Sequence, residues 1–448
     1  MNQRMADDIL RDTRVNTFHL IVMFWCSVLM LCDGYDLVIY GAVLPYLMTD
    51  WGLSSVTAGL IGSSALLGMM MGALGLGSAS DRFGRKPVIL VCLVVFSLAA
   101  LANGFTENPA QFALCRFLTG VGLGGMVPNI VALMSEMAPP AARNRMVTLV
   151  LSCYAIGGVV AALIGKSLAP QYGWRISFFL AGLSLLSLPL LLRWLPESLM
   201  FLLARGRIDE AEPLLRRFAP QFQGGARVLV ALADGRRDEA IPARATELFR
   251  RGHAATTLCL WTAFGMCMLM VYGLNTWLPK LMAAGGYPLG SAISFLMTLN
   301  FGAVLGCLFS GWLADRYGGK PTLMLFFAIA AISVGLLGFN PSPRVLTLLL
   351  MCAGATTIGT LCMVHAYAAH IYPSQIRSTG VGWAASAGRI GAVAGPALGG
   401  YLLNADFAAS SNFLVFAIPG VVAVFAVTRL PSGENSERAV DSVTATSE

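Results

Sequence analysis

Twelve apolar runs, each long enough to cross a bilayer, constrain the fold of this chain more than any other feature of its sequence. A transmembrane helix needs about 20 mostly apolar residues to span ~30 Å of hydrocarbon. Only 12% of the 448 residues are charged, whereas soluble domains carry roughly 25%. The sequence therefore predicts an all-α membrane protein with twelve transmembrane helices. The runs lie at 18–47, 56–79, 87–105, 109–135, 146–169, 175–195, 255–281, 289–313, 321–340, 344–371, 378–403 and 411–430.

The basic residues predict how these helices are oriented. If the N-terminus is cytoplasmic, the inner segments hold 24 of the 30 Lys and Arg residues and the outer segments hold four. Such an excess follows the positive-inside rule. We therefore expect both termini to be cytoplasmic. We assign the net charge of +7 to topology and to contact with anionic lipid, not to nucleic-acid binding.

The ten cysteines all lie in the apolar runs or at their edges, and the chain contains no CxxC motif and no Cys/His cluster. Such residues usually serve as small apolar packing groups. The sequence therefore predicts no disulfide framework and no metal site.

An internal repeat organises the chain. The sequence DRFGRKP at 81–87 recurs as DRYGGKP at 315–321, and Pro139 and Arg143 recur as Pro373 and Arg377, all with an offset of 234. Two loops with one offset predict two pseudo-symmetric six-helix halves that rock around a substrate path near the midplane. The predicted parts are the halves 1–195 and 254–430, a cytoplasmic linker 196–253 with an interfacial helix, and a disordered cytoplasmic tail 431–448.

The repeated loop motif and the twelve helices in two halves resemble the major facilitator superfamily. Five further motifs together resemble its aromatic acid:proton symporters: DGYDLVIYGAVLP in the first run, RFLTGVGLGG in the fourth, LPESLMFL after the sixth, NTWLP in the seventh and GRIGAVAGPALGG in the eleventh. DGYDLVIYG looks most like the benzoate-transporting branch. The resemblance implies a proton-coupled carrier of a small aromatic carboxylate in a bacterial inner membrane.

Two acidic residues lie inside the first apolar run. Asp33 and Asp36 are spaced i, i+3 and share one helix face. A carboxylate deep in the bilayer costs at least ~2.5–3.5 kcal/mol, so such residues usually pair, face water or carry protons. Arg116 in the fourth run lies at a depth that allows pairing. We predict that Asp33, Asp36 and Arg116 couple transport to protons; the alternative is a static ion pair.

Arg389 in the eleventh run is the candidate substrate anchor. A guanidinium forms a bidentate pair with a carboxylate. The apolar runs of the C-terminal half contain no acid, because Asp315 lies in an inner loop and Asp406 lies beyond an outer end. Gating or packing is the alternative role for this arginine.

An aromatic acid also needs a slot lined by apolar and aromatic side chains with a few polar groups. The substrate-binding candidates are Tyr35, Asn275, Trp277, Asn300 and Trp383, beside Arg389. Tyr40, Tyr154 and Tyr272 are further candidates for lining the slot. Each aromatic residue has packing as its alternative role, and Trp277 can also belong to the interfacial aromatic belt. His365 is a candidate proton relay or a hydrogen-bonded structural residue.

Charged residues at the inner helix ends are predicted to form a gate whose ion pairs break when the inner side opens. They are Asp81, Arg82, Arg85, Glu136, Arg143, Asp315, Arg316 and Arg377. The second loop has Gly319 in place of Arg85, which weakens the case for a gate there.

The predicted function is proton-coupled import of a monocyclic aromatic carboxylate, benzoate or a hydroxybenzoate, by a monomer in the lipid bilayer. No nucleotide-binding loop, metal cluster or nucleophile–base pair points to an enzyme. Two alternatives remain. One is proton-driven efflux of drugs or other organic anions, and the other is a sensor that binds aromatic acids without transporting them.

Overall fold

The computed structural model describes residues 13–220, 245–249, 254–339, 341–372, 377–405 and 407–431. These ranges contain twelve long helical segments and no strand, which confirms the predicted all-α fold. The segments are α2 (Thr17–Trp51), the run α3 (Ser55–Gly72), η1 (Ala73–Gly77) and α4 (Ser78–Phe83), α5 (Arg85–Gly104), α6 (Pro109–Met137), α7 (Arg143–Ser167), the run α9 (Arg175–Gly182), η2 (Leu183–Ser187) and α10 (Leu188–Trp194), α14 (Ala254–Ala284), α15 (Leu289–Tyr317), α16 (Gly319–Leu337), α17 (Pro343–Ile371), α18 (Arg377–Asn404) and α19 (Ala409–Thr428). Shorter helices are α8 (Ala169–Tyr172), α11 (Leu199–Ala204), α12 (Ile208–Phe218) and η3 (Ala245–Phe249).

Eleven of the twelve segments are long and apolar enough to cross a membrane by themselves. The twelfth, α18, is less apolar because it is rich in Gly, Ala and Ser and carries Arg389 near its middle. A helix of this composition spans a bilayer when its small residues let neighbouring helices approach it closely.

Contacts divide the chain into two compact units. The first contains the described residues of 1–36, 67–157 and 175–241, and the second those of 37–66, 158–174 and 242–448. The boundary falls inside α2, α3 and α7, so these units do not coincide with the two halves of the repeat. The division into halves at 1–195 and 254–430 stays a prediction.

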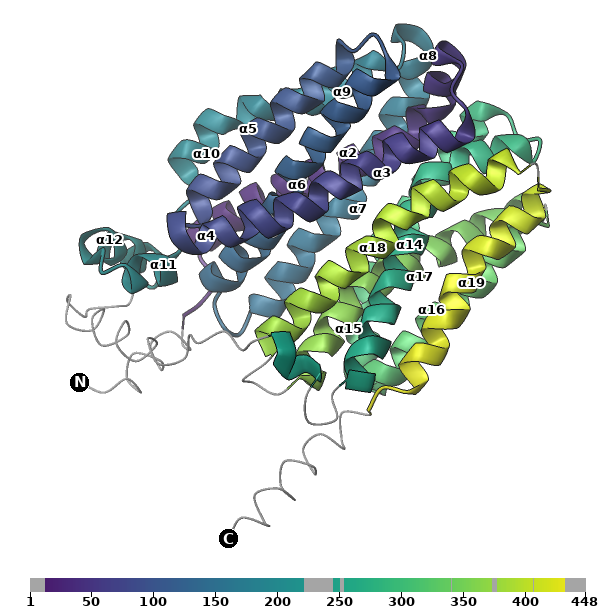
Figure 1. Ribbon diagram of the computed structural model, residues 1–448. Coiled ribbons are helices and arrows are strands. Elements are labelled where there is room, and N and C mark those ends of the chain that lie inside the picture. Colours follow the sequence, from purple (N-terminus) through teal and green to yellow (C-terminus); the bar gives the residue numbers. More distant parts are fainter. Residues whose placement is uncertain are drawn as a thin grey trace. The chain divides into compact units, whose positions relative to one another are not determined.

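In the first unit α5 packs between α6 and α9 (Figure 1). In the same unit α2 crosses α7 at two glycines. A Cβ atom on Gly34 would lie 1.8 Å from the carbonyl oxygen of Tyr154, and one on Gly157 would lie 2.1 Å from that of Leu31. Only glycine permits this approach of the two backbones, and the crossing lies beside the two predicted acids of α2.

In the second unit the helices pack in pairs: α14 with α18, α15 with α17 and α16 with α19 (Figure 1). The α14–α18 pair is close because a Cβ on Gly391 would lie 1.9 Å from the carbonyl oxygen of Gly265. The C-terminal part of α2 belongs to this unit, where Gly41 meets the backbone of Asn275.

The repeat is visible in the geometry of its two loops. Gly84 and Gly318 both have left-handed backbone angles, with φ of 100° and 88°, which favour glycine. Lys86 Nζ donates to the carbonyl oxygen of Leu192 (2.8 Å) near the end of α10. Lys320 Nζ donates to that of Thr428 (2.9 Å) at the end of α19. Each lysine therefore caps the last long helix of its own repeat, where a cation also complements the helix dipole.

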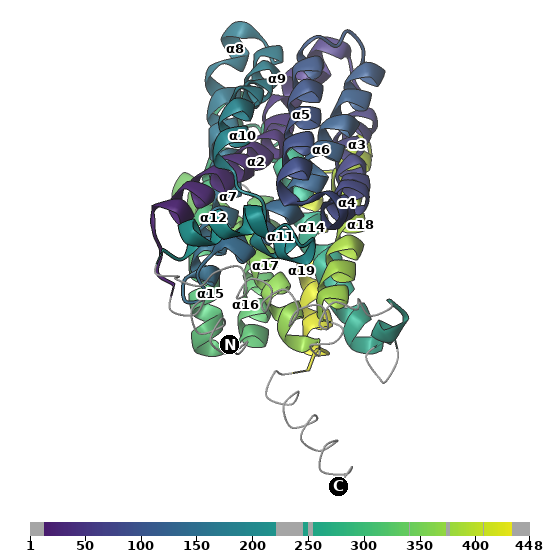
Figure 2. The same ribbon diagram turned by 90° about the vertical axis from the view of Figure 1, so that its left-hand side faces the viewer.

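Helices α11 and α12 lie at one end of the first unit, near α4 (Figures 1 and 2). Asn16 Nδ2 donates to the carbonyl oxygen of Arg217 (3.1 Å), which joins α12 to the start of α2. In α12 the first turn is acidic, the last turn is basic, and Ala211, Leu215 and Phe218 are buried. This amphipathic helix is the candidate for the predicted interfacial helix; residues 221–244 of the linker and 432–448 of the tail lie outside the described ranges.

Candidate functional site

A buried ion pair joins α2 to α6 in the first unit. Arg116 Nη1 lies 2.8 Å from Oδ1 and 2.8 Å from Oδ2 of Asp36. Both residues are 2% exposed. Each of these buried charges is stabilised by the other, because removing one partner of such a pair costs about 3–5 kcal/mol. The structure thus brings together two of the three residues predicted to couple transport to protons.

Asp33 lies one turn before Asp36 on α2 and is also 2% exposed. Gly34, between the two acids in the sequence, lies at the crossing with α7, so both acids are close in sequence to the point where the two helix backbones touch. Two carboxylates this close along one helix resist ionising together. Their spacing therefore suits a site that exchanges one proton.

Tyr35, a substrate-binding candidate, is 6% exposed. Its hydroxyl donates to the carbonyl oxygen of Ser177 in α9 (2.8 Å). This hydrogen bond ties α2 to α9 and favours the packing role for Tyr35.

Two candidate substrate-binding residues meet in the second unit. Asn300 Nδ2 on α15 donates to Asn275 Oδ1 on α14 (3.0 Å), and both side chains are at most 2% exposed. Asn275 Nδ2 in turn donates to the carbonyl oxygen of Val271 (2.8 Å). Within the described residues no group donates to Asn300 Oδ1. A Cβ atom on Gly158 would lie 2.3 Å from this oxygen, so Asn300 Oδ1 faces the backbone of α7. A buried acceptor in this state is costly.

The two tryptophan candidates are engaged elsewhere in the second unit. Trp277 is fully buried, and its indole Nε1 donates to the carbonyl oxygen of Pro396 in α18 (2.7 Å). Trp383 is 48% exposed and stacks on Trp261 of α14, with ring centroids 6.1 Å apart. It lies on the same helix face as Ile390, which is 67% exposed. These placements favour packing for Trp277 and a surface role for Trp383.

Arg389 lies near the middle of α18 and is half-buried. The neighbouring Gly388 packs against Phe264 of α14, since a Cβ there would lie 3.0 Å from the Phe264 Cβ. The ring of Phe264 meets the ring of His365 on α17 edge-on, at 4.8 Å between centroids. His365 Nδ1 lies 2.8 Å from the carbonyl oxygen of Leu361. A neutral imidazole that donates there presents Nε2 as a proton acceptor.

Part of the predicted inner gate forms a network in the first unit. Arg85 pairs with Asp81 (2.6 Å) and lies 3.6 Å from Glu136. Its Nη1 also donates to Ser80 Oγ (2.8 Å). The network links α4, α5 and α6 through one guanidinium.

Residues of the LPESL segment complete this network, and their role was not predicted from the sequence. Ser198 Oγ donates to Glu136 Oε2. Glu197 Oε1 accepts from the backbone N–H of Arg85 (2.8 Å) and caps the start of α5. A proline followed by an acid and a serine directly after an apolar run was the available signal.

The remaining gate candidates do not join this network. The carbonyl oxygen of Arg82 accepts from Arg205 Nη2 (2.7 Å), and its guanidinium carbon lies 5.4 Å from the ring centre of Phe83. Arg316 lies over the rings of Trp312 and Tyr317 at 5.5 and 5.7 Å. Within the described part of the chain, no ion pair involves Asp315, Arg316 or Arg143. The side chain of Arg377 lies outside the described residues.

No group of three His, Cys, Asp or Glu side chains in the described ranges is arranged to hold a metal ion. The ion pair Asp36–Arg116 belongs to the first unit, whereas the Asn275–Asn300 amide pair, His365 and Arg389 belong to the second.

The sequence profile of the Major Facilitator Superfamily matches residues 26–307 and 289–445. The chain belongs to the major facilitator superfamily. This facilitator is 41% identical to the benzoate transport protein of Acinetobacter baylyi over 94% of its own length and 91% of that protein. It is 33% identical to the gentisate transporter of Corynebacterium glutamicum (92% and 86%) and to the 4-hydroxybenzoate transporter PcaK of A. baylyi (94% and 93%).

A solved structure of the xylose transporter XylE from E. coli, in a partially occluded inward-open conformation, matches with a TM-score of 0.76 at 18% identity. The match covers 93% of this facilitator and 99% of that chain. The comparisons confirm the predicted major facilitator fold and the resemblance to the aromatic acid transporter branch. They also confirm that this multi-pass membrane protein is a transporter and not an enzyme.

Proposed function

We propose that this facilitator imports a monocyclic aromatic carboxylate together with protons across a bacterial inner membrane by alternating access. The observation that carries the proposal is the buried Asp36–Arg116 pair in a chain similar to transporters named for benzoate and 4-hydroxybenzoate. When a proton neutralises the acid of a buried ion pair, the remaining positive charge stays buried without a partner, which is energetically costly. The relatives' names supply the class of substrate.

The proposed proton step takes place on α2. A proton enters from the outer side and neutralises Asp36, or Asp33 one turn away. When Asp36 takes the proton, the Arg116 guanidinium loses its counter-charge, which favours a different packing of α2 against α6. Loss of the proton to the inner side restores the pair and resets the carrier.

The proposed substrate step takes place in the second unit. The carboxylate docks on the fork of Arg389, which matches its two oxygens. His365 takes or passes a proton when the carboxylate arrives on Arg389. The ion pairs around Arg85 and Glu136 break when the carrier opens to the inner side.

The test uses the purified protein in proteoliposomes with labelled benzoate or 4-hydroxybenzoate. An inward proton gradient should drive accumulation of at least one acid, and a protonophore should abolish it. Protein-free liposomes correct for diffusion of the neutral acid. Loss of preloaded acid under the same gradient would instead indicate proton-driven efflux. Binding without any transport would indicate a sensor.

A further inference from the structure

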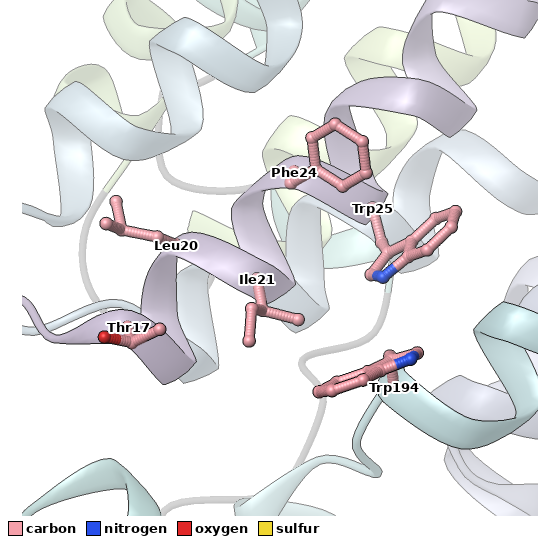
Figure 3. A pocket seen from close by; sticks show the side chains of 6 residues that line it. All are labelled: Thr17, Leu20, Ile21, Phe24, Trp25 and Trp194. Atoms are coloured by element: carbon pink, nitrogen blue, oxygen red, sulfur yellow. The ribbon is translucent and has the colours of Figure 1, made fainter.

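A surface groove and a pair of cysteines lie outside the residues proposed for transport. The groove, of about 310 Å³, lies between the start of α2 and the end of α10 (Figure 3). None of its lining side chains carries a charge or a thiol, so the groove selects no class of ligand; they are Thr17, Leu20, Ile21, Phe24, Trp25 and Trp194. The cysteines, in contrast, carry reactive groups.

The two cysteines lie in the second unit, one on α15 and one on α17. Cys307 Sγ lies 3.5 Å from Cys362 Sγ, so the thiol of one residue can donate a hydrogen bond to the sulfur of the other. Both thiols are free. Cys307 is 1% exposed, whereas Cys362 is half-buried. A small oxidant therefore reaches Cys362 first.

The backbones of α15 and α17 touch beside this pair. A Cβ atom on Gly306, next to Cys307, would lie 1.9 Å from the carbonyl oxygen of Ala355. A Cβ atom on Gly359, about one turn before Cys362, would lie 3.0 Å from the carbonyl oxygen of Gly306. A disulfide needs sulfur atoms about 2.05 Å apart and Cα atoms within about 7 Å. Because the helices are already in contact here, rotation of the two side chains can close the remaining gap between the sulfur atoms.

A third cysteine, Cys267 on α14, is engaged with another partner. Its thiol donates to the carbonyl oxygen of Thr357 (3.5 Å). Within the described ranges no three His, Cys, Asp or Glu side chains are arranged to hold a metal ion. The offset of 234 maps Cys307 onto Ala73 and Cys362 onto Pro128. The two thiols therefore form a dithiol that only the second repeat carries.

This dithiol lies next to the proposed proton relay. Cys362 precedes His365 by three residues, and residues with this spacing are neighbours on a helix surface. A covalent bond at this point would prevent α17, the helix of His365, from shifting against α15. Shifts of packed helices are one way in which proteins pass between two states.

We infer that hydrogen peroxide oxidises Cys307 and Cys362 to a reversible disulfide, and that this bond slows transport. The effect on transport rests on the proposed function. The Cys362 sulfur attacks one peroxide oxygen and the O–O bond breaks, which leaves a sulfenic acid on Cys362, and the departing hydroxide takes the thiol proton as water. The Cys307 sulfur then attacks the Cys362 sulfur, and the displaced hydroxide leaves with the Cys307 proton as a second water. Two thiols thus lose two electrons to one peroxide, and a thiol reductant reverses the bond by exchange.

The experiment exposes the protein in proteoliposomes to hydrogen peroxide and then blocks the remaining thiols with N-ethylmaleimide. Mass spectrometry identifies disulfide-linked peptides. Uptake of labelled benzoate is measured in parallel, before and after treatment with dithiothreitol. Four proteins are compared: wild type, Cys307→Ser, Cys362→Ser and the matched control Cys352→Ser. Cys352 also lies on α17 and is also half-buried.

After peroxide, the wild type and the control should contain a peptide linked through Cys307 and Cys362 and should lose most of their uptake. Dithiothreitol should restore both the thiols and the uptake. The variants Cys307→Ser and Cys362→Ser should form no such link and should keep their uptake in peroxide.

A wild type in which both thiols stay reduced under peroxide would overturn the inference. A linked protein that transports at the untreated rate would also overturn it. An equal loss of uptake in either of the Cys307→Ser and Cys362→Ser variants would do the same, because the peroxide would then act elsewhere. Absence of uptake in the untreated wild type would instead contradict the proposed function, and the linked peptides would still decide whether the disulfide forms.

Discussion

Nη1 of Arg116 lies 2.8 Å from both carboxylate oxygens of Asp36, and this contact joins α2 to α6 across 80 residues of sequence. Both side chains are 2% exposed. Removing one partner of a buried pair costs about 3–5 kcal/mol, and we propose that this pair alternates between a paired and a released state. Such a two-state element is what coupling to a proton requires.

The variant Asp36→Asn should lose uphill uptake and unfold at a lower temperature, because it leaves Arg116 buried without its counter-charge. Adding Arg116→Gln should recover much of the stability, since both charges are then gone, but should not recover uptake. Thermal unfolding in detergent and gradient-driven uptake separate the two effects. Full uphill uptake in both Asp36→Asn and Asp33→Asn would show that neither acid carries the proton.

The variant Arg389→Ala should weaken substrate affinity by about 10- to 100-fold, the range expected when a hydrogen bond to a charged group of about 1.5–3 kcal/mol is lost. The substrate affinity of Arg389→Lys should lie between those of the wild type and Arg389→Ala, because lysine keeps the charge but cannot form the bidentate pair. The measurement is the concentration dependence of uptake, with Arg429→Gln as a control at the end of α19. An unchanged affinity in Arg389→Ala would remove the arginine from the binding site.

The variant Gly34→Ala should disrupt folding or transport, because its Cβ would lie 1.8 Å from the carbonyl oxygen of Tyr154. Gly311→Ala is the matched control. Nothing lies within 4 Å of a Cβ at that position in α15, so alanine there should be neutral or stabilise the helix by up to about 1 kcal/mol. Yield of folded protein and melting temperature report the difference. Equal behaviour of the two variants would argue against the close crossing of α2 and α7.

The variant Glu197→Ala should loosen α11 and α12, because its carboxylate caps α5 and its neighbour Ser198 bonds to Glu136. Trypsin should then cleave faster after Arg205 and Arg207. Glu212→Ala is the control, since its exposed pair with Arg216 is worth only about 0.3–0.5 kcal/mol. Identical cleavage rates in the two variants would mean that Glu197 does not hold this segment.

The fold could be predicted from the sequence because each long apolar run has one solution in a bilayer, the helix. The repeat at an offset of 234 could also be recognised in the sequence. Its two copies share a geometry, because Lys86 and the equivalent Lys320 each donate to a carbonyl oxygen at the end of a helix. The compact units could not be predicted, because they depend on where small residues such as Gly41 and Gly157 let helices approach.

The candidate site was only partly predictable. The depth of each residue along its helix, estimated at 1.5 Å per residue, is compatible with an ion pair between Arg116 and either acid. The three-dimensional structure shows that Arg116 pairs with Asp36. Trp277 and Trp383 met the requirement for aromatic residues, but sequence does not specify that one indole bonds to Pro396 or that the other faces outward. Glu197 and Ser198 were missed because their partners lie more than 60 residues away in sequence.

The most direct test of the central claim is the proton flux that the substrate drives. Proteoliposomes that contain a pH-sensitive dye are given benzoate outside at equal pH, and the signal of protein-free liposomes is subtracted. The wild type should acidify the lumen as benzoate enters, whereas Asp36→Asn/Arg116→Gln should not. Equal proton entry in the two proteins would contradict a role for the Asp36–Arg116 pair in coupling, and benzoate entry without protons in the wild type would contradict symport itself.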